Sequence, residues 1–132
     1  MVKAAIIVLA GTGGPDGLGR VVNAMEAVKE FESAGDDVRL VFDGAGTQWV
    51  EELATPEHKY HGLFEAVRES ITGVCTYCAK AFGVSDAVEQ AGLPFAHDYE
   101  DHPSFRQLVL DGYQVITFDV ETEGLAHEMN PF

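Results

Sequence analysis

One apolar run near the start of the chain constrains the fold most. The segment "AAIIVLA", Ala4 to Ala10, contains no polar residue, which is typical of a strand that is covered on both faces. The glycine-rich stretch "GTGGPDGLG" comes next, and after it apolar residues repeat at helical spacing until Gly35. A buried strand that leads through a loop into a long helix predicts a parallel strand–helix–strand unit.

The same alternation continues along the chain. We expect a helix at 15–34, strands at 37–44, 70–75 and 113–118, a short helix after Thr47, a helix opened by Thr55-Pro56-Glu57, short helices at 78–82 and 85–92, and a last helix from about Pro103. Parallel strands joined by helices require right-handed crossovers. The predicted fold class is therefore α/β, a single three-layer sandwich with a mainly parallel sheet of about four to five strands, Rossmann-like or flavodoxin-like.

The domain is expected to cover residues 1–118. Residues 119–132 form an acidic tail without a clear pattern, which we expect to be either mobile or an oligomer contact.

Charge limits the partners that such a protein can have. The 132 residues include 22 Asp and Glu against 8 Lys and Arg, which gives a formal net charge of −14. This surface repels nucleic acids and anionic membranes, and no apolar run reaches the ~20 residues that span a bilayer. The apolar N-terminal run ends in a glycine loop and reads as a strand, not as a signal peptide. We therefore predict a cytoplasmic protein with no nucleic-acid or membrane partner, in which a permanent disulfide is not expected.

The carboxyl ends of parallel strands are where ligands bind in open α/β sheets. Three segments are predicted to meet there: the loop 11–16, the loop 43–48 and the segment that begins at Cys75. Gly13, Gly14 and Asp43 are the candidate ligand-binding residues of the two loops.

The glycine loop departs from both nucleotide-binding patterns that it resembles. Arg20 and Val21 stand where a phosphate loop has Lys and then Ser or Thr, and Asp16 replaces the last Gly of G-x-G-x-x-G. A plain turn and an anion site made of backbone amides both stay open. No cofactor is predicted.

Cys75 and Cys78 are the only cysteines in the chain. Cys75 ends the third predicted strand and Cys78 lies in the first turn of the next helix, where the helix N-terminus stabilises a thiolate. The pair is compatible with inert packing, half of a zinc site, a thioredoxin-like redox site or a sulfur carrier. A thioredoxin-like site requires a mixed sheet and a cis-proline beside the motif, and the parallel pattern argues against it.

Zinc requires further ligands, and His97 and His102 complete an approximate Cys2His2 spacing. A zinc finger folds around its metal, however, whereas this spacing falls inside a domain that has its own core. The loop "HDYEDHP" is also expected to be exposed. We therefore predict no metal and expect both histidines to lie well away from the cysteines. His58 and His61 are expected to be solvated surface residues.

Three segments, "AMEAVKEFESAGDDVRLVFDGAGTQWV", "GVCTYCAKAFGV" and "LVLDGYQVITF", together resemble the DsrE/DsrF-like family of small sulfur-relay proteins. The resemblance covers the chain up to Phe118. It implies a small α/β domain that forms oligomers, and a cysteine at the end of a middle strand that accepts a persulfide and passes the sulfur to a partner. Cys75 matches that position. Three features depart from the family pattern: the second cysteine, the lack of the basic residues that some relatives carry after the motif, and the tail.

These observations predict a sulfur-relay or thiol-redox protein that carries a persulfide or transient disulfide on Cys75, assisted by Cys78. The expected partners are a sulfur donor or acceptor protein and further copies of the chain, as a dimer, trimer or hexamer. The alternative is a non-catalytic oligomeric module that binds a small ligand or nucleotide.

Overall fold

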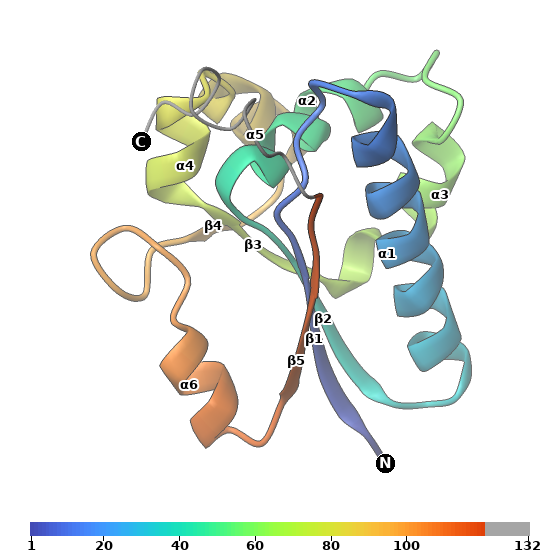
Figure 1. Ribbon diagram of the computed structural model, residues 1–132, viewed down its shortest axis with the longest axis vertical. Coiled ribbons are helices and arrows are strands. Elements are labelled where there is room, and N and C mark those ends of the chain that lie inside the picture. Colours follow the sequence, from blue (N-terminus) through green and yellow to red (C-terminus); the bar gives the residue numbers. More distant parts are fainter. Residues whose placement is uncertain (121–132) are drawn as a thin grey trace.

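The computed structural model describes residues 1–120, which form one sheet of five parallel strands with helices on both faces (Figure 1). The elements are β1 (Lys3–Val8), α1 (Pro15–Ser33), β2 (Asp37–Phe42), η1 (Gly44–Thr47), α2 (Gln48–Leu53), α3 (His61–Ala66), η2 (Arg68–Ser70), β3 (Ile71–Cys75), α4 (Thr76–Ala81), α5 (Ser85–Ala91), β4 (Phe95–Ala96), α6 (Phe105–Leu110) and β5 (Gln114–Phe118). The predicted α/β fold with a parallel sheet is confirmed.

The strand order, β4-β3-β2-β1-β5, explains why the two faces of the sheet differ. From β1 to β4 each strand is added on the same side, so right-handed crossovers place α1 to α5 on one face. The connection from β4 to β5 runs back across the sheet and places α6 alone on the other face (Figure 1). The larger hydrophobic cluster accordingly lies under α1 to α5, and a smaller one lies under α6.

Strand β1 occupies an inner position and contacts both clusters. Ile6 and Val8 belong to the larger cluster and Ala5 and Ile7 to the smaller one, and all four side chains are fully buried. Because both faces of β1 are covered, its sequence is a continuous apolar run and does not alternate between apolar and polar residues.

The glycine loop before α1 is shaped by close packing. A Cβ atom on Gly17 would lie 2.0 Å from the carbonyl oxygen of Gly11, and one on Gly11 would lie 2.6 Å from Gln48 Oε1. Trp49 Nε1 donates a hydrogen bond of 2.8 Å to the carbonyl oxygen of Ala10. The close approach of α1 to the loop therefore excludes a side chain at Gly17, and the segment 45–48 crowds the position of one at Gly11.

Two predicted helix starts are placed differently. Thr55 Oγ1 donates to the carbonyl oxygen of Glu51, so Thr55 closes α2 and does not open the next helix, which begins at His61. Thr47 stands at the N-cap position of α2, but its hydroxyl donates back to the carbonyl oxygen of Gly44. Such local hydroxyl bonds compete with capping, and the sequence pattern does not distinguish the two.

Strand β4 was not expected as a separate strand. It has two residues, which pair with Val74 and Cys75 of β3.

Of the predicted tail, residues 121–132 lie outside the described residues. Among residues 1–120, no helix combines the length and the apolar character needed to cross a membrane.

Candidate functional site

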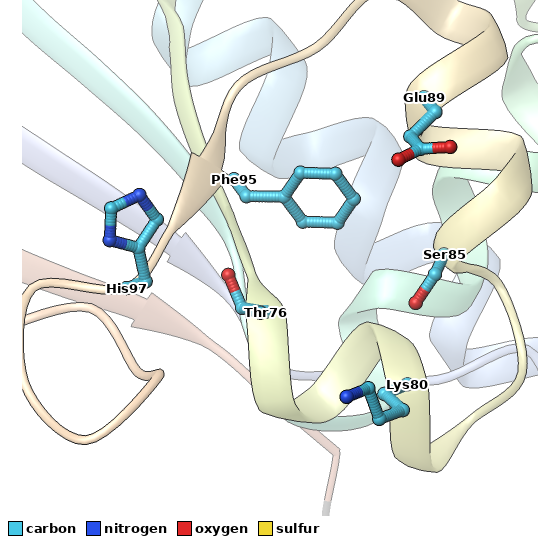
Figure 2. A pocket seen from close by; sticks show the side chains of 6 residues that line it. All are labelled: Thr76, Lys80, Ser85, Glu89, Phe95 and His97. Carbon is cyan, nitrogen blue, oxygen red and sulfur yellow. The ribbon is translucent and has the colours of Figure 1, made fainter.

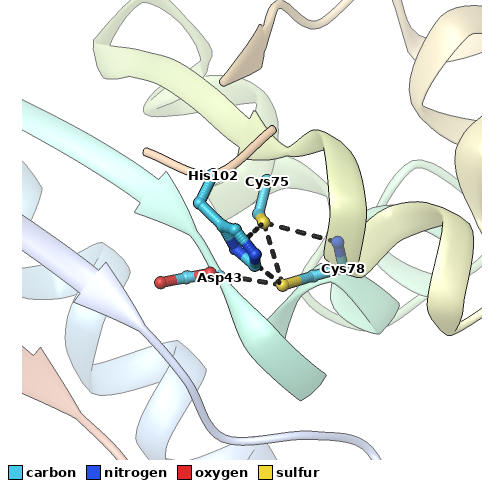
Figure 3. Close-up of side chains that lie close together, drawn as sticks. All are labelled: Asp43, Cys75, Cys78 and His102. Carbon is cyan, nitrogen blue, oxygen red and sulfur yellow. Dashed lines mark hydrogen bonds between the residues drawn. The ribbon is translucent and has the colours of Figure 1, made fainter. Parts of the chain in front are cut away.

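The site lies where the adjacent strands β2 and β3 end. Asp43 directly follows β2, and Cys75 is the last residue of β3. Since parallel strands end at the same edge of the sheet, these two residues meet there, and α4 begins immediately after Cys75. Cys78, in the first turn of α4, lies with its Sγ 3.4 Å from Asp43 Oδ1 (Figure 3).

The two cysteines form a dithiol pair. Their Sγ atoms are 2.9 Å apart, and both cysteines are free. Cys75 is also the N-cap residue of α4, because its Sγ accepts a hydrogen bond of 3.3 Å from the backbone N–H of Cys78. This capping contact fixes the two sulfurs on the same side of the helix start, so a small displacement is enough to bring them to the S–S bond length of about 2.05 Å.

His102 completes the group, and the expectation that it lies away from the cysteines was wrong. Its Nδ1 atom is 3.3 Å from Cys75 Sγ and 4.0 Å from Cys78 Sγ (Figure 3). The connection from β4 to α6 must cross to the other face of the sheet, and on its way it passes the end of β3. His97 is exposed and is not among the four residues of the cluster.

A tight turn holds His102 in place. Tyr99 and His102 exchange two backbone hydrogen bonds, of 2.9 and 2.8 Å, around Glu100 and Asp101, whose φ angles are +48° and +65°. Positive φ at both central residues is the pattern of a type I′ turn, and it is unfavourable for residues other than glycine. The carbonyl oxygen of Asp101 accepts a hydrogen bond of 2.9 Å from the backbone N–H of Tyr77, which attaches the turn to α4.

Burial governs the chemistry of the thiols. Cys75 is 0% exposed, Cys78 is 1% exposed and Asp43 is 8% exposed. Desolvation is the largest cause that raises the pKa of both thiols, and the negative charge of Asp43 raises the pKa of each further. In this conformation both cysteines are therefore buried thiols, and burial outweighs the stabilisation of a thiolate that the helix N-terminus offers.

The predicted ligand-binding glycines are not near the cysteines in any described contact. Gly13 and Gly14 are exposed at the start of α1, whereas Asp43, predicted with them, belongs to the cysteine cluster. Of the two hollows described, the larger has a volume of about 450 Å³ and lies beside α4 and α5, lined by Thr76, Lys80, Ser85, Glu89, Phe95 and His97 (Figure 2). The smaller, of about 140 Å³, lies beside α6. Neither hollow is lined by Cys75, Cys78, Gly13 or Gly14.

The segments of Asp43 and Cys75 were expected to meet at the ends of their strands, and the structure brings these two residues together, but the place of His102 beside the cysteines was not expected. The spacing of Cys75, Cys78 and His102 carries this signal, although its position inside a domain with its own core, in a loop expected to be exposed, argued against a shared site.

The sequence profile of the DsrE/DsrF-like family matches residues 5–118. The chain belongs to this family. The match spans the strands from β1 to β5 and includes every residue of the cysteine cluster.

Two further proteins are similar to the chain. The uncharacterized protein MJ0733 of Methanocaldococcus jannaschii is 28% identical over 87 residues, which cover 66% of this chain and 70% of that protein. The structure of BT1422, a conserved protein of unknown function from Bacteroides thetaiotaomicron, covers 86% of this chain and 93% of its own, with a TM-score of 0.57 and 16% identity. At this identity the second comparison supports the fold alone.

Proposed function

We propose that this DsrE/DsrF-like protein transfers sulfane sulfur through Cys75, with His102 as the proton acceptor and Cys78 as the resolving thiol. The observation that supports this most directly is the contact of three reactive groups at the end of β3, where Cys75 Sγ lies 2.9 Å from Cys78 Sγ and 3.3 Å from His102 Nδ1. An inert packed pair does not require a histidine nitrogen at hydrogen-bond distance.

His102 supports the first step because it offers a base to a thiol whose pKa is raised. Transfer of the Cys75 proton to Nδ1 gives a thiolate beside an imidazolium, and this pair of opposite charges is less costly to bury than a thiolate alone. The backbone N–H of Cys78, 3.3 Å from Cys75 Sγ, stabilises the same thiolate.

The transfer of sulfur to Cys75 is a nucleophilic displacement at the donor persulfide. The Cys75 thiolate attacks the terminal sulfur of a donor persulfide R–S–SH, and a bond forms between Sγ and that sulfur. The S–S bond of the donor breaks, and its electron pair leaves on R–S⁻, which takes the proton from His102. The products are a Cys75 persulfide and the thiol R–SH.

Cys78 is placed to resolve this persulfide. Its sulfur attacks Cys75 Sγ, the bond to the added sulfur breaks, and that sulfur leaves as hydrogen sulfide with the Cys78 proton. The two cysteine sulfurs are oxidised to a disulfide while the sulfane sulfur is reduced, so a dithiol reductant is needed to restore the pair. In the absence of this step, the persulfide is available to an acceptor.

Access to Cys75 requires the turn 99–102 to move. The turn covers the sulfurs, and it is attached by the Asp101 carbonyl oxygen, which contacts both the Tyr77 N–H and, at 3.7 Å, Cys75 Sγ. A donor that displaces this turn exposes the thiol at the moment of transfer and leaves it protected from oxidation at other times.

The test is intact-mass spectrometry of the reduced, metal-free protein after incubation with inorganic polysulfide. The wild type is expected to gain the mass of one sulfur atom, Cys75→Ser to gain none, and Cys78→Ser to keep the added sulfur longer. His102→Asn is expected to slow the gain by roughly 10²–10⁴-fold, the usual contribution of a positioned base. His97→Asn is the matched control and should react like the wild type. Addition of sulfur to Cys75→Ser at the wild-type rate would exclude Cys75 as the carrier.

A further inference from the structure

Four side chains of different chemistry converge at the end of β3. Asp43, Cys75, Cys78 and His102 each direct one donor atom into the same volume, and these atoms all lie within 4.8 Å of one another (Figure 3). The set consists of two sulfurs, one imidazole nitrogen and one carboxylate oxygen. They come from three separate parts of the chain: the end of β2, the junction of β3 with α4, and the turn before α6.

We propose that these four residues form a tetrahedral zinc site. Sulfur, imidazole and carboxylate are the ligands that Zn²⁺ takes in proteins, and four is the coordination number of its structural sites. This inference does not depend on the proposed sulfur transfer, because it requires only the positions of the four donors.

The distances between the donors fit this geometry. A tetrahedral zinc ion with bonds of about 2.0–2.3 Å holds its ligands about 3.3–3.8 Å apart. The contacts along the cluster are 2.9 Å between the two sulfurs, 3.3 Å from Cys75 Sγ to His102 Nδ1, 3.4 Å from Cys78 Sγ to Asp43 Oδ1 and 4.0 Å from Cys78 Sγ to Nδ1. Shifts of less than about 1 Å bring these pairs to the zinc values.

The surroundings of the donors resemble the outer ligand environment of a metal centre. Asp43 Oδ1 also accepts a hydrogen bond of 2.8 Å from the backbone N–H of Gly44, and Cys75 Sγ accepts one from the N–H of Cys78. These bonds orient a carboxylate and a thiolate before any ion arrives. The His102 ring lies 4.9 Å from the Tyr77 ring, which limits its rotation.

Charge balance also favours the ion. A divalent cation that enters the cluster displaces the protons of both thiols. The net charge of the buried group is then the same before and after binding, so the exchange adds no uncompensated charge to the interior. Neither Lys nor Arg is among the groups that contact Asp43 in the described hydrogen bonds, so zinc would be the cation in direct contact with this buried carboxylate, while the net charge of the group stays the same.

Zinc binding and sulfur transfer exclude each other at any one moment, because both use the lone pairs of the same sulfurs. Bound zinc would keep the thiols from reacting, and release of the ion would make them available.

The test uses the full chain, reduced and freed of metal with a chelator, and titrates it with Co²⁺ as a coloured substitute for Zn²⁺. We expect one equivalent to bind, with visible bands of a tetrahedral ion and near-ultraviolet thiolate-to-cobalt bands, both lost when one equivalent of Zn²⁺ is added. About two protons should be released for each ion bound.

The variants then identify the ligands. Asp43→Asn, Cys75→Ser, Cys78→Ser and His102→Asn should each weaken zinc affinity, measured against a chromophoric chelator, by at least the roughly 10–100-fold that loss of an outer partner costs. His97→Asn is the matched control and should bind like the wild type. Circular dichroism of each metal-free variant separates loss of ligands from loss of fold.

Three results would overturn the zinc site: no stoichiometric binding by the folded, reduced wild type, an octahedral cobalt spectrum, or affinity that His102→Asn and Asp43→Asn leave unchanged. Since no sulfur donor is present in this experiment, its failure leaves the sulfur-transfer proposal standing. Conversely, a protein that binds zinc but gains no sulfur would refute only the sulfur transfer.

Discussion

At the scale of single residues, Asp43 has opposite consequences for the two proposed uses of the cysteines. Its carboxylate is nearly buried and lies 3.4 Å from Cys78 Sγ. A negative charge in that position opposes ionisation of a neighbouring thiol, yet it is an attractive ligand for a cation. A sulfur carrier alone would gain nothing from it.

Asp43→Asn should therefore change the two activities in opposite directions. Without the buried charge the thiolate costs less, so alkylation of the folded, metal-free protein by iodoacetamide should be faster than in the wild type, by up to about tenfold for each 1.4 kcal/mol of repulsion removed. Zinc affinity should fall in the same variant. The measurement is the rate of mass gain per thiol, with Asp86→Asn on α5 as a control for a lost surface charge. Slower alkylation than in the wild type would show that Asp43 assists ionisation.

At the scale of elements, the turn before α6 is the strained part of the site. Glu100 and Asp101 both have positive φ, although neither is glycine. A left-handed conformation costs such residues roughly 1–2 kcal/mol each, and the strain persists because the Asp101 carbonyl oxygen is held by the Tyr77 N–H. The same turn carries His102 to the cysteines, and strained backbone of this kind is common at functional sites.

Asp101→Gly should relieve part of this strain, because glycine adopts positive φ without a steric penalty. The greater flexibility of glycine in the unfolded chain offsets part of the gain, so the expected net stabilisation is about 0.5–1 kcal/mol. Gly92→Ala is the reverse substitution for comparison. Gly92 is the C-cap of α5 and has a φ of +72°, so alanine there should destabilise the protein by a similar amount. Urea unfolding of the metal-free proteins measures both. A destabilised Asp101→Gly variant would mean that the aspartate side chain contributes more than its backbone strain costs.

Some elements of the fold and site could be predicted from the sequence and others could not. The β1–α1 unit was predictable because its apolar pattern is set by burial on both faces of the sheet, and Cys75 could be placed at the end of β3 for the same reason. Strand β4 has two residues and carries no periodic pattern. The position of His102 follows from a crossover whose path depends on strand order, which local sequence does not encode. The sequence therefore placed the proposed sulfur carrier correctly and misplaced the side chain proposed as its base.

At the scale of the whole molecule, Tyr113 connects the start of β5 to the start of β2. Its hydroxyl donates a hydrogen bond of 2.7 Å to Asp37 Oδ2, and Lys3 and Arg39 lie over its ring. Desolvation first, and then the bond to Asp37, raise the pKa of Tyr113. The folded state therefore prefers the neutral phenol more strongly than the unfolded chain does.

This preference predicts a loss of stability at high pH. Below the unfolded pKa of about 10 the contribution is fully present, and it is lost as the pH rises through the higher folded pKa, because only the unfolded chain gains by ionising. Tyr113→Phe should cost about 0.5–1.5 kcal/mol at neutral pH and should lose less stability than the wild type above pH ~10. Thermal melts across pH 7–11 measure this, and the difference in tyrosinate absorbance between the wild type and Tyr113→Phe should appear only above pH ~10. Parallel stability curves for the two proteins would contradict the prediction.

The helices cover the two faces of the sheet unequally, and this predicts that copies of the chain associate. Helix α6 covers its face of the sheet alone, and its outer side exposes Phe105, Val109 and Leu110 to 41%, 64% and 60%. Exposed apolar side chains grouped on one short helix are typical of a contact surface. We therefore expect copies of the chain to associate through α6, most strongly in salt, which screens the repulsion between subunits that each carry a formal charge of −14.

The test is light scattering of the wild type and of Val109→Glu/Leu110→Glu, in low and in high salt. The wild type should be an oligomer in high salt, and the double variant should be a monomer in both conditions, because buried carboxylates at a contact are costly. Ala66→Glu/Gln90→Glu adds the same charge on α3 and α5, at exposed positions beside the other face of the sheet. This control should assemble like the wild type. A monomeric wild type at every salt concentration would refute the association, and equal dissociation of both double variants would assign the effect to net charge, not to α6.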